Sequence, residues 1–234
     1  MSKEAFTGKA DVYAQARPGY AAAALDFISG LVNNLGAVIA DIGAGTGKFS
    51  VLLAGRGFNV IAVEPNADMR AKLPDCVRAV DGTAEATGLP DSSVDAVTCA
   101  QAFHWFDPEG FKSECRRILK PGGRVFVMYN RPREHEESHP ELDWLPSKYD
   151  PDTWRKNEEA ISAFFGDFMR REAFPNPIEY GRELYEAYML SHSTSPRPGD
   201  EIYARFMESV HAIFERCNME GKLFLPLQTV VYTN

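Results

Sequence analysis

From Val38 to Tyr129, short apolar runs alternate with segments in which apolar residues recur every three or four positions. The runs have the length and composition of strands buried on both faces, and they lie at residues 37–41, 59–65, 76–80, 94–100 and 124–129. The segments between them predict helices, among them a short one capped by Asn66 and one that ends before the glycines at 122–123. Strands that alternate with helices predict βαβ units, so we expect an α/β fold with a doubly wound, mainly parallel sheet.

The chain on either side of this alternation has a different pattern. Apolar residues at helical spacing predict helices at 20–32, 160–168, 181–191 and 202–217. Residues 222–233 predict one or two strands, whose simplest place is an antiparallel hairpin at the edge of the sheet. We therefore expect a single domain in four parts: an N-terminal helical lid segment (1–37), a ligand-binding core (38–130), a cap or insertion (131–200), and a C-terminal helix with edge strands (201–234).

Composition and charge narrow the kind of protein. With 234 residues the chain has the size of one domain, and its net charge of −8 argues against a surface that binds nucleic acid. No apolar run is long enough to span a membrane, and the N-terminal segment lacks the apolar core of a signal peptide. The 4 cysteines are scattered without metal-binding spacing, which is typical of reduced thiols. We expect a cytoplasmic protein without nucleic-acid or membrane partners, either a monomer or a homodimer.

The first apolar run ends in Asp41 and leads into three glycines at positions 43, 45 and 47. A phosphate loop of the form G-x-x-x-x-G-K-[ST] needs a hydroxyl after the lysine, but Lys48 is followed by Phe49. The dinucleotide fingerprint G-x-G-x-x-G needs its third glycine at position 48, which is the lysine. The loop therefore favours a ligand that lies against the backbone without a phosphate at this turn.

Two acids beside this loop indicate the chemistry of the ligand. Asp41 can accept hydrogen bonds from a cationic amino group, and Glu64, at the end of the second run, can bind both hydroxyls of a ribose. A ligand with an amino acid at one end, a ribose in the middle and an adenine beyond would use both acids and the loop. S-adenosylmethionine is such a ligand, so we expect it as the cofactor, with S-adenosylhomocysteine as its product and no metal.

Five motifs follow one another along this part of the chain. They are "DIGAGTG", the acid of "VIAVEP", "GLPDSSVD", "QAFHWF" and "LKPGG", and "YAQARPGY" precedes them. In these motifs the chain resembles the class I S-adenosylmethionine-dependent methyltransferases, and among them the type 11 or trans-aconitate-methyltransferase-like group that acts on small molecules. The resemblance is close over residues 38–129. It implies a Rossmann-like, seven-stranded sheet whose last two strands form an antiparallel edge hairpin, together with a small helical cap.

The resemblance also implies which residues bind the cofactor. The glycine loop would hold it, Glu64 would bind the ribose, and Thr83 and Ala84 would lie beside the adenine. The family often has Asp where this chain has Thr83, so the contact to the adenine amino group is expected from Glu85 or from the backbone of Ala84. The expected cofactor-binding residues are Asp41, Gly43, Ala44, Gly45, Gly47, Glu64, Pro65, Thr83, Ala84, Glu85 and Gln101.

Candidate residues for the reaction lie in "AQAFHWFD", after the strand predicted at 94–100, because ligands bind at the carboxyl ends of parallel strands. Methyl transfer from a sulfonium is an in-line displacement, in which the enzyme mainly aligns the reacting atoms. We expect Gln101 to hold the methionine end, His104 to orient the substrate or act as a base, and Trp105 to form a wall of the pocket. The alternative for His104 is a histidine packed against a neighbouring aromatic ring.

A second candidate cluster consists of Tyr13, Arg17 and Tyr20 in the N-terminal segment. In the family group this segment folds over the active site, and Arg17 could pair with a carboxylate of the cofactor or of an acidic substrate. The alternative for Arg17 is an exposed side chain before a turn at 18–19.

The function expected from these residues is S-adenosylmethionine-dependent methyl transfer to a small-molecule acceptor, for which a carboxylic acid is one candidate. The alternatives are methylation of a macromolecule, a nicotinamide-dependent oxidoreductase on the same fold, and a non-catalytic binding module. His135 and His139 lie among glutamates in a polar segment with no matching ligand elsewhere, so we expect no metal site there.

Overall fold

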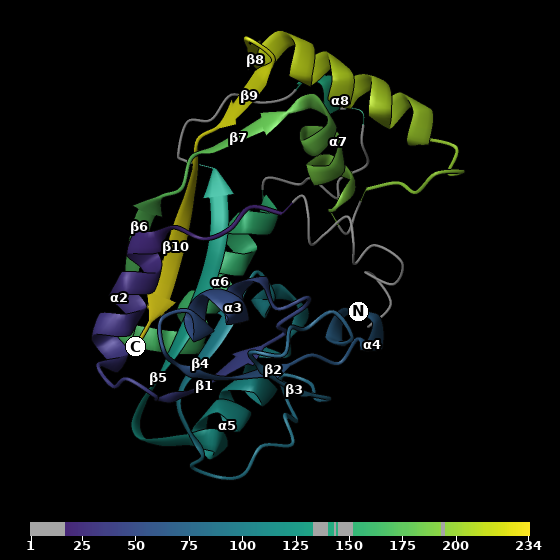
Figure 1. Cartoon of the computed structure of the whole chain (residues 1–234). Helices are drawn as coiled ribbons and strands as arrows, with labels where there is room; N and C mark the ends of the chain where they lie inside the picture. Colours follow the sequence, from purple (N-terminus) through teal and green to yellow (C-terminus); the bar gives the residue numbers. More distant parts are fainter. Residues whose placement is uncertain (1–16, 133–139, 143, 145–151, 193–194) are drawn as a thin grey trace.

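The computed structural model describes residues 17–132, 140–142, 144, 152–192 and 195–234, and its centre is a seven-stranded sheet in the order β3-β2-β1-β4-β5-β10-β6 (Figure 1). The strands of this sheet are β1 (Val38–Ile42), β2 (Asn59–Val63), β3 (Arg78–Val80), β4 (Val94–Ala100), β5 (Leu119–Pro132), β6 (Arg170–Pro175) and β10 (Leu227–Thr233). Strands β1 to β5 pair in parallel, whereas β10 is antiparallel to both of its neighbours, β5 and β6. This is the doubly wound, mainly parallel sheet that the sequence predicts.

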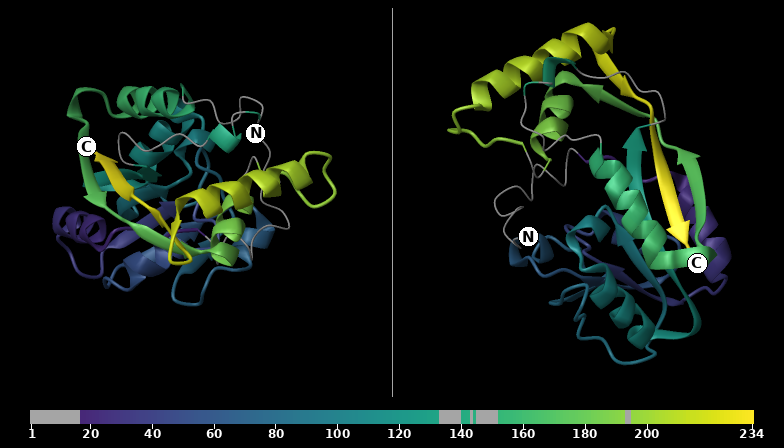
Figure 2. Two further views of the ribbon diagram at one scale, coloured as in Figure 1. Left: turned by 90° about the horizontal axis from the view of Figure 1, so that it is seen from above. Right: turned by 180° about the vertical axis from the view of Figure 1, so that it is seen from behind.

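Helices cover both faces of the sheet, which explains why its central strands are continuous apolar runs (Figure 2). On one face, α2 (Ala22–Val32) and α3 (Lys48–Ala54) pack against β1 and β10. On the other face, α5 (Pro108–Ile118) and α6 (Asp152–Phe165) pack against β4 and β5 through a cluster of phenylalanine rings. In the described residues, longer elements are connected by the short 3-10 helices η1 (Phe103–Trp105), η2 (Pro140–Leu142) and η4 (Gly166–Phe168).

The main sheet ends in an antiparallel pair, as predicted, but the pair is β10 with β6 and not two strands of residues 222–233. Only β10 enters the main sheet, and it lies between β5 and β6; the preceding strand, β9 (Lys222–Leu225), pairs instead with β7 (Ile178–Gly181) and β8 (Asn218–Met219) in a separate sheet. The edge strand of the main sheet is β6, from the segment that the sequence assigned to the cap. Its charged residues and the absence of a buried face made it unrecognisable as a strand, since an edge strand is covered on one side at most.

The cap is a second layer of structure beyond the end of the sheet toward which β5 points (Figure 1). It consists of α7 (Arg182–Leu190), α8 (Tyr203–Cys217) and the small sheet, so it is not purely helical. These elements share a core of their own, in which Tyr180, Tyr185 and Phe214 are buried. Residues 201–225, which were predicted to belong to a C-terminal region separate from the cap, are therefore part of the cap.

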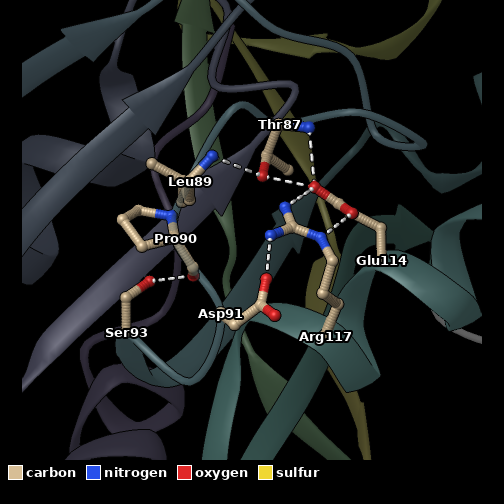
Figure 3. A network of polar contacts seen from close by, with 7 residues as sticks. All are labelled: Thr87, Leu89, Pro90, Asp91, Ser93, Glu114 and Arg117. Carbon is tan, nitrogen blue, oxygen red and sulfur yellow. Dashed lines mark hydrogen bonds and ion pairs between the residues drawn. The ribbon is translucent and has the colours of Figure 1, made fainter.

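A polar network joins the loop before β4 to α5 (Figure 3). One oxygen of Glu114 accepts hydrogen bonds from the Thr87 backbone nitrogen at 2.8 Å and from the Thr87 hydroxyl at 2.6 Å. Arg117 donates to both Glu114 oxygens, at 2.8 and 2.7 Å, and to Asp91 Oδ1 at 2.6 Å. The motif "GLPDSSVD" therefore has a structural role here, which is to hold the chain between β3 and β4 against α5.

Candidate functional site

The glycine loop after β1 is shaped by left-handed backbone conformations. Gly43, Gly45 and Gly47 have φ angles of +68°, +59° and +82°, which residues with a Cβ rarely adopt. The backbone nitrogens of Gly43 and Ala44 donate to the Val63 carbonyl at 2.9 and 3.2 Å, so the end of β2 fixes the loop. A Cβ at Gly45 would meet nothing within 4 Å, whereas one at Gly43 or Gly47 would collide with a neighbouring side chain. The loop thus presents an open face without side chains at Gly45.

Glu64, directly after β2, holds this loop through its carboxylate. Its two oxygens accept hydrogen bonds from the backbone nitrogens of Gly45 and Asn66, each at 2.8 Å. Glu64 is buried, and this burial raises the pKa of its carboxyl group, although both hydrogen bonds oppose the effect. An ionised carboxylate has about four acceptor positions, so two backbone bonds leave capacity for hydroxyl groups of a ligand.

Asp41, at the end of β1, is a buried acid between two hydroxyl groups. Its Oδ2 accepts a hydrogen bond from Ser50 at 2.5 Å and its Oδ1 accepts one from Thr98 at 2.9 Å. Burial raises the pKa of Asp41 to about 6, with the two hydroxyls opposing the rise and the charge of Glu64 adding to it. At neutral pH the group is an ionised carboxylate, and a nearby cation would stabilise it further.

This shifted pKa predicts how stability changes with pH. The folded protein keeps the Asp41 proton up to about pH 6, whereas the unfolded chain releases it near 3.8. The proton therefore contributes on the order of 3 kcal/mol to the free energy of unfolding below pH 4, and this contribution is lost as the pH rises through 6. In urea unfolding, the free energy of unfolding of the wild type minus that of Asp41→Asn should decline as the pH rises from about 4 to above 6. Parallel pH profiles would contradict the assignment.

A cavity lies between the glycine loop and the N-terminal segment. The space between its walls is about 470 Å³, a volume that includes open solvent. Its lining residues are Arg17, Pro18, Tyr20, Asp41, Gly43, Ala44, Gly45, Thr46, Lys48, Phe49, Ala100 and Gln101. Among these residues of the described chain, Arg17 and Lys48 are the cations and Asp41 is the carboxylate, so positive charge is in excess.

The two cations lie close to each other. The ammonium group of Lys48 donates to the backbone carbonyl of Arg17, and burial, followed by the positive charge of Arg17, lowers the pKa of Lys48. Arg17 in turn donates to the Ser191 carbonyl in the cap at 3.3 Å. It therefore lies between the cavity and the cap. Lys48 was not predicted as a site residue, because the phosphate-loop motif around it is incomplete. Its position one residue after the glycine loop was the signal that could have identified it.

A set of amide and hydroxyl side chains holds the N-terminal segment over the cavity. Asn130 of β5 and Asn176 both donate to the Gly19 carbonyl, at 2.8 and 2.9 Å. Thr229 of β10 donates to Asn130 Oδ1 at 2.6 Å and accepts from the Ala21 backbone nitrogen at 2.9 Å. These contacts fix the backbone on both sides of Tyr20, whose ring lies 4.9 Å from that of Phe49.

The residues expected beside the adenine lie in the loop after β3. Thr83 and Ala86 exchange backbone hydrogen bonds in a turn, and Ala84 is buried. Glu85 is exposed and accepts a hydrogen bond from the Asp107 backbone nitrogen at 2.9 Å. Glu85 therefore ties this loop to the start of α5.

The segment after β4 places Gln101 at the cavity and His104 beside it. Gln101 has a φ of +59°, a strained conformation for a residue other than glycine, and its backbone nitrogen donates to the Met128 carbonyl at 2.8 Å. The His104 ring lies 4.8 Å from the Trp105 ring and 6.0 Å from the Tyr129 ring. Although His104 as a residue is exposed, burial of its ring by these neighbours, and then the charge of Arg17, lowers its pKa to about 4.

The cavity thus brings together seven of the residues singled out from the sequence: Arg17, Tyr20, Asp41, Gly43, Ala44, Gly45 and Gln101. The others lie outside its lining: Gly47, Glu64, Pro65, Thr83, Ala84, Glu85, His104 and Trp105. Of these, Glu64 still contacts the loop through Gly45. Tyr13, His135 and His139 lie outside the described residues.

The structure has the features that the resemblance to class I S-adenosylmethionine-dependent methyltransferases implies: a mainly parallel seven-stranded sheet with one antiparallel strand, a glycine loop after β1 and an acid after β2. Comparison with known proteins agrees, because residues 40–127 match the family described as a methyltransferase domain. This match to part of the chain agrees with the resemblance in sequence.

Individual relatives support the same class. The chain is 43% identical over 129 residues to an uncharacterised methyltransferase of Mycobacterium tuberculosis and 42% identical over 135 residues to one of Schizosaccharomyces pombe, in each case covering 53% of this chain and 51% of the relative. The chain thus spans about half the length of the curated relatives it matches. Its fold is similar to the crystal structure of a proposed methyltransferase from an antibiotic biosynthesis pathway of Anabaena variabilis, with a TM-score of 0.63, 26% identity and coverage of 94% of this chain and 98% of the other.

None of the helices in the described part of the chain combines the length and apolar character needed to cross a bilayer. Within residues 17–132, 140–142, 144, 152–192 and 195–234, no group of three or more His, Cys, Asp or Glu side chains has the arrangement of a metal site.

Proposed function

We propose that this chain transfers a methyl group from S-adenosylmethionine to a small carboxylic acid. The observation that carries the proposal is the pairing of two cations, Arg17 and Lys48, with Asp41 and the glycine loop around one cavity. The family supplies the class of cofactor, and the excess positive charge supports an anionic acceptor.

The residues present fit S-adenosylmethionine. The open face at Gly45 has room for a nucleoside against the backbone, and Glu64 has acceptor positions left for ribose hydroxyls. Asp41 would balance the cationic amino group, and Gln101 would contact the methionine end. The adenine would lie toward the loop that contains Thr83 and Ala84.

When bound, S-adenosylmethionine supplies a methyl group on a sulfonium, from which a carboxylate oxygen takes the methyl carbon while the C–S electron pair goes to sulfur and no proton moves. The part left to the protein is alignment and charge. Arg17 suits this role because it lies between the cavity and the cap, and because it can bind a carboxylate through two nitrogens. Tyr188 of α7, whose ring centre is 5.9 Å from the Arg17 guanidinium carbon, limits where that guanidinium can lie.

Calorimetry and a product assay test this function. S-adenosylhomocysteine should bind and NAD should not, and small carboxylic acids, but not their amides, should gain a methyl group detectable by mass spectrometry. Binding of NAD instead, or transfer to no acid in a broad panel, would overturn the proposal.

Arg17→Met should separate the acceptor from the cofactor. Loss of a charge-assisted hydrogen bond costs about 1.5–3 kcal/mol, so KM for the acid should rise about 10- to 150-fold while the Kd of S-adenosylhomocysteine changes little. The matched control is Arg155→Gln, which removes an exposed arginine of α6 that pairs with Glu159. A large change in Kd without a change in KM would assign Arg17 to the methionine carboxylate.

A further inference from the structure

A row of three polar side chains crosses the part of the main sheet formed by β5, β10 and β6 (Figure 1). Asn130 lies in β5, Thr229 is its partner in β10, and Asn176 directly follows β6. The hydroxyl of Thr229 donates to Asn130 Oδ1 at 2.6 Å, and Nδ2 of Asn176 donates to the same oxygen at 3.1 Å. These three residues, the polar row, are thus joined to one another by hydrogen bonds.

The polar row lies on a face of the sheet that is otherwise apolar. Residues two positions apart in a strand point to the same face, and the neighbours on this face are Met128 in β5 and Val231 in β10, which are buried in the core beneath α2. Thr229 is fully buried and Asn130 is 8% exposed. Because burying a polar group has a cost that an apolar residue avoids, packing alone does not account for the polar row.

The polar row binds the backbone of residues 17–21. It donates twice to the Gly19 carbonyl, at 2.8 and 2.9 Å, and it accepts from the Ala21 backbone nitrogen at 2.9 Å. Both positions precede α2, which begins at Ala22. The polar row therefore holds the segment before the helix.

The same segment forms part of the cavity wall, through Arg17, Pro18 and Tyr20. The hydrogen bonds from the polar row, and the one that the Arg17 carbonyl accepts from Lys48, are made by side chains. Residues 17–21 themselves belong to no helix or strand. These hydrogen bonds can therefore break while the sheet and α2 stay intact, as in a local opening of low free energy.

We propose that Asn130, Thr229 and Asn176 are positioning residues that hold residues 17–21 as a part of the cavity wall that opens to admit the cofactor and to release its product. The choice of cofactor rests on the proposed function. Thr229 has the central place in this arrangement, since its hydroxyl both accepts from Ala21 and donates to Asn130.

Hydrogen exchange of the full chain, without cofactor or substrate, tests whether this wall opens by itself. The Ala21 amide should exchange about 100-fold or more faster than the amides of Ile28 in α2 and Ile39 in β1, after correction for intrinsic rates. Its exchange should also depend little on low concentrations of urea, because a local opening exposes little surface. If Ala21 exchanges only through the global unfolding that exposes Ile39, the wall is fixed and the proposal is wrong.

The kinetics of S-adenosylhomocysteine binding test the role of the polar row. Thr229→Val keeps the branched shape of the side chain but has no hydroxyl, so residues 17–21 should be open more of the time. Stopped-flow measurements should show that both the association and the dissociation rate rise, the latter about 5- to 30-fold. Unchanged rates, or a rise in the dissociation rate alone as for a lost ligand contact, would overturn the proposal.

Three further variants control for folding and stability. Thr229→Ser restores the hydroxyl and should return both rates to those of the wild type. Asn176→Ala removes one donor to Gly19 at an exposed position, so it should raise both rates even if Thr229→Val does not fold. Arg56→Met removes a side chain that donates to the Ala22 carbonyl of α2 at 3.2 Å, and it should leave both rates unchanged. Equal effects of Arg56→Met and Thr229→Val would assign the change to the stability of α2 and contradict the proposal.

The two measurements also separate this proposal from the proposed function. Local exchange of Ala21 together with no binding of S-adenosylhomocysteine would contradict the function and still support a wall that opens. Binding of S-adenosylhomocysteine together with exchange of Ala21 only by global unfolding would support the function and overturn the opening.

Discussion

Glu64→Ala should weaken binding of S-adenosylhomocysteine by about 10- to 150-fold, which corresponds to about 1.5–3 kcal/mol for lost hydrogen bonds to a charged group. The buried carboxylate accepts from the backbone nitrogens of Gly45 and Asn66, and its remaining lone pairs would accept from the ribose hydroxyls of the proposed cofactor. The substitution removes the ligand contact and also frees the Gly45 amide of the glycine loop. Isothermal titration calorimetry measures the combined effect.

A control variant changes the residue beside Glu64 without removing its carboxylate. Asn66→Ala removes the side chain that caps α4 (Ala67–Arg70), where Asn66 Oδ1 accepts from the Met69 backbone nitrogen at 3.0 Å, but leaves the Glu64 carboxylate in place. It should destabilise α4 by about 1 kcal/mol and change ligand affinity little. If Glu64→Ala binds S-adenosylhomocysteine as tightly as the wild type, the carboxylate does not bind the ribose.

The parallel part of the fold could be predicted because each step has a local signal. β1 is an apolar run whose residues Ile39, Ala40 and Ile42 are buried on both faces, and such runs have no other common explanation at that length. The glycines after it adopt the conformations that their spacing suggests, with positive φ at each. Asn66 caps α4 as predicted.

The cap could not be predicted in the same way, since its contacts join residues that are far apart in sequence. Tyr180 packs against Leu223 in the cap core, and Arg17 reaches Ser191, which lies 174 positions later. No pattern within a few residues of either partner specifies such a pair. β6 has a related difficulty, because an edge strand with charged side chains lacks the alternation that identifies strands.

The candidate site shows the same division between local and long-range information. Asp41, the glycines and Gln101 belong to short motifs, and the structure places them at one cavity. The hydrogen-bond partner of His104 comes from β5, as Tyr129, and no motif links this tyrosine to a histidine in the segment after β4. Sequence therefore located the candidate groups, while the chemical state of His104 required the three-dimensional arrangement.

Glu114→Ala should lower the free energy of unfolding by about 2–4 kcal/mol. The substitution leaves the backbone nitrogen and hydroxyl of buried Thr87 without the acceptor they share, and each such buried donor costs about 1–3 kcal/mol. The pairing with Arg117 adds less, because the Arg117 side chain is 38% exposed and its charge is screened by solvent. Urea unfolding measures the change, and Glu109→Ala, which removes another acid of α5, is the control and should cost under about 1 kcal/mol.

The same carboxylate gives the loss a specific pH dependence. Hydrogen bonds from Arg117, and then from Thr87, lower the pKa of Glu114 to about 2, and burial opposes this shift only in part. In the unfolded chain the same carboxyl group titrates near 4.5. A depressed pKa contributes stability that is present above the unfolded value and is lost as the pH falls through the folded one. The difference in unfolding free energy between the wild type and Glu114→Ala should therefore be constant above about pH 5 and shrink toward pH 2. A difference that grows on acidification would mean that the network in Figure 3 does not hold Glu114 in its ionised form.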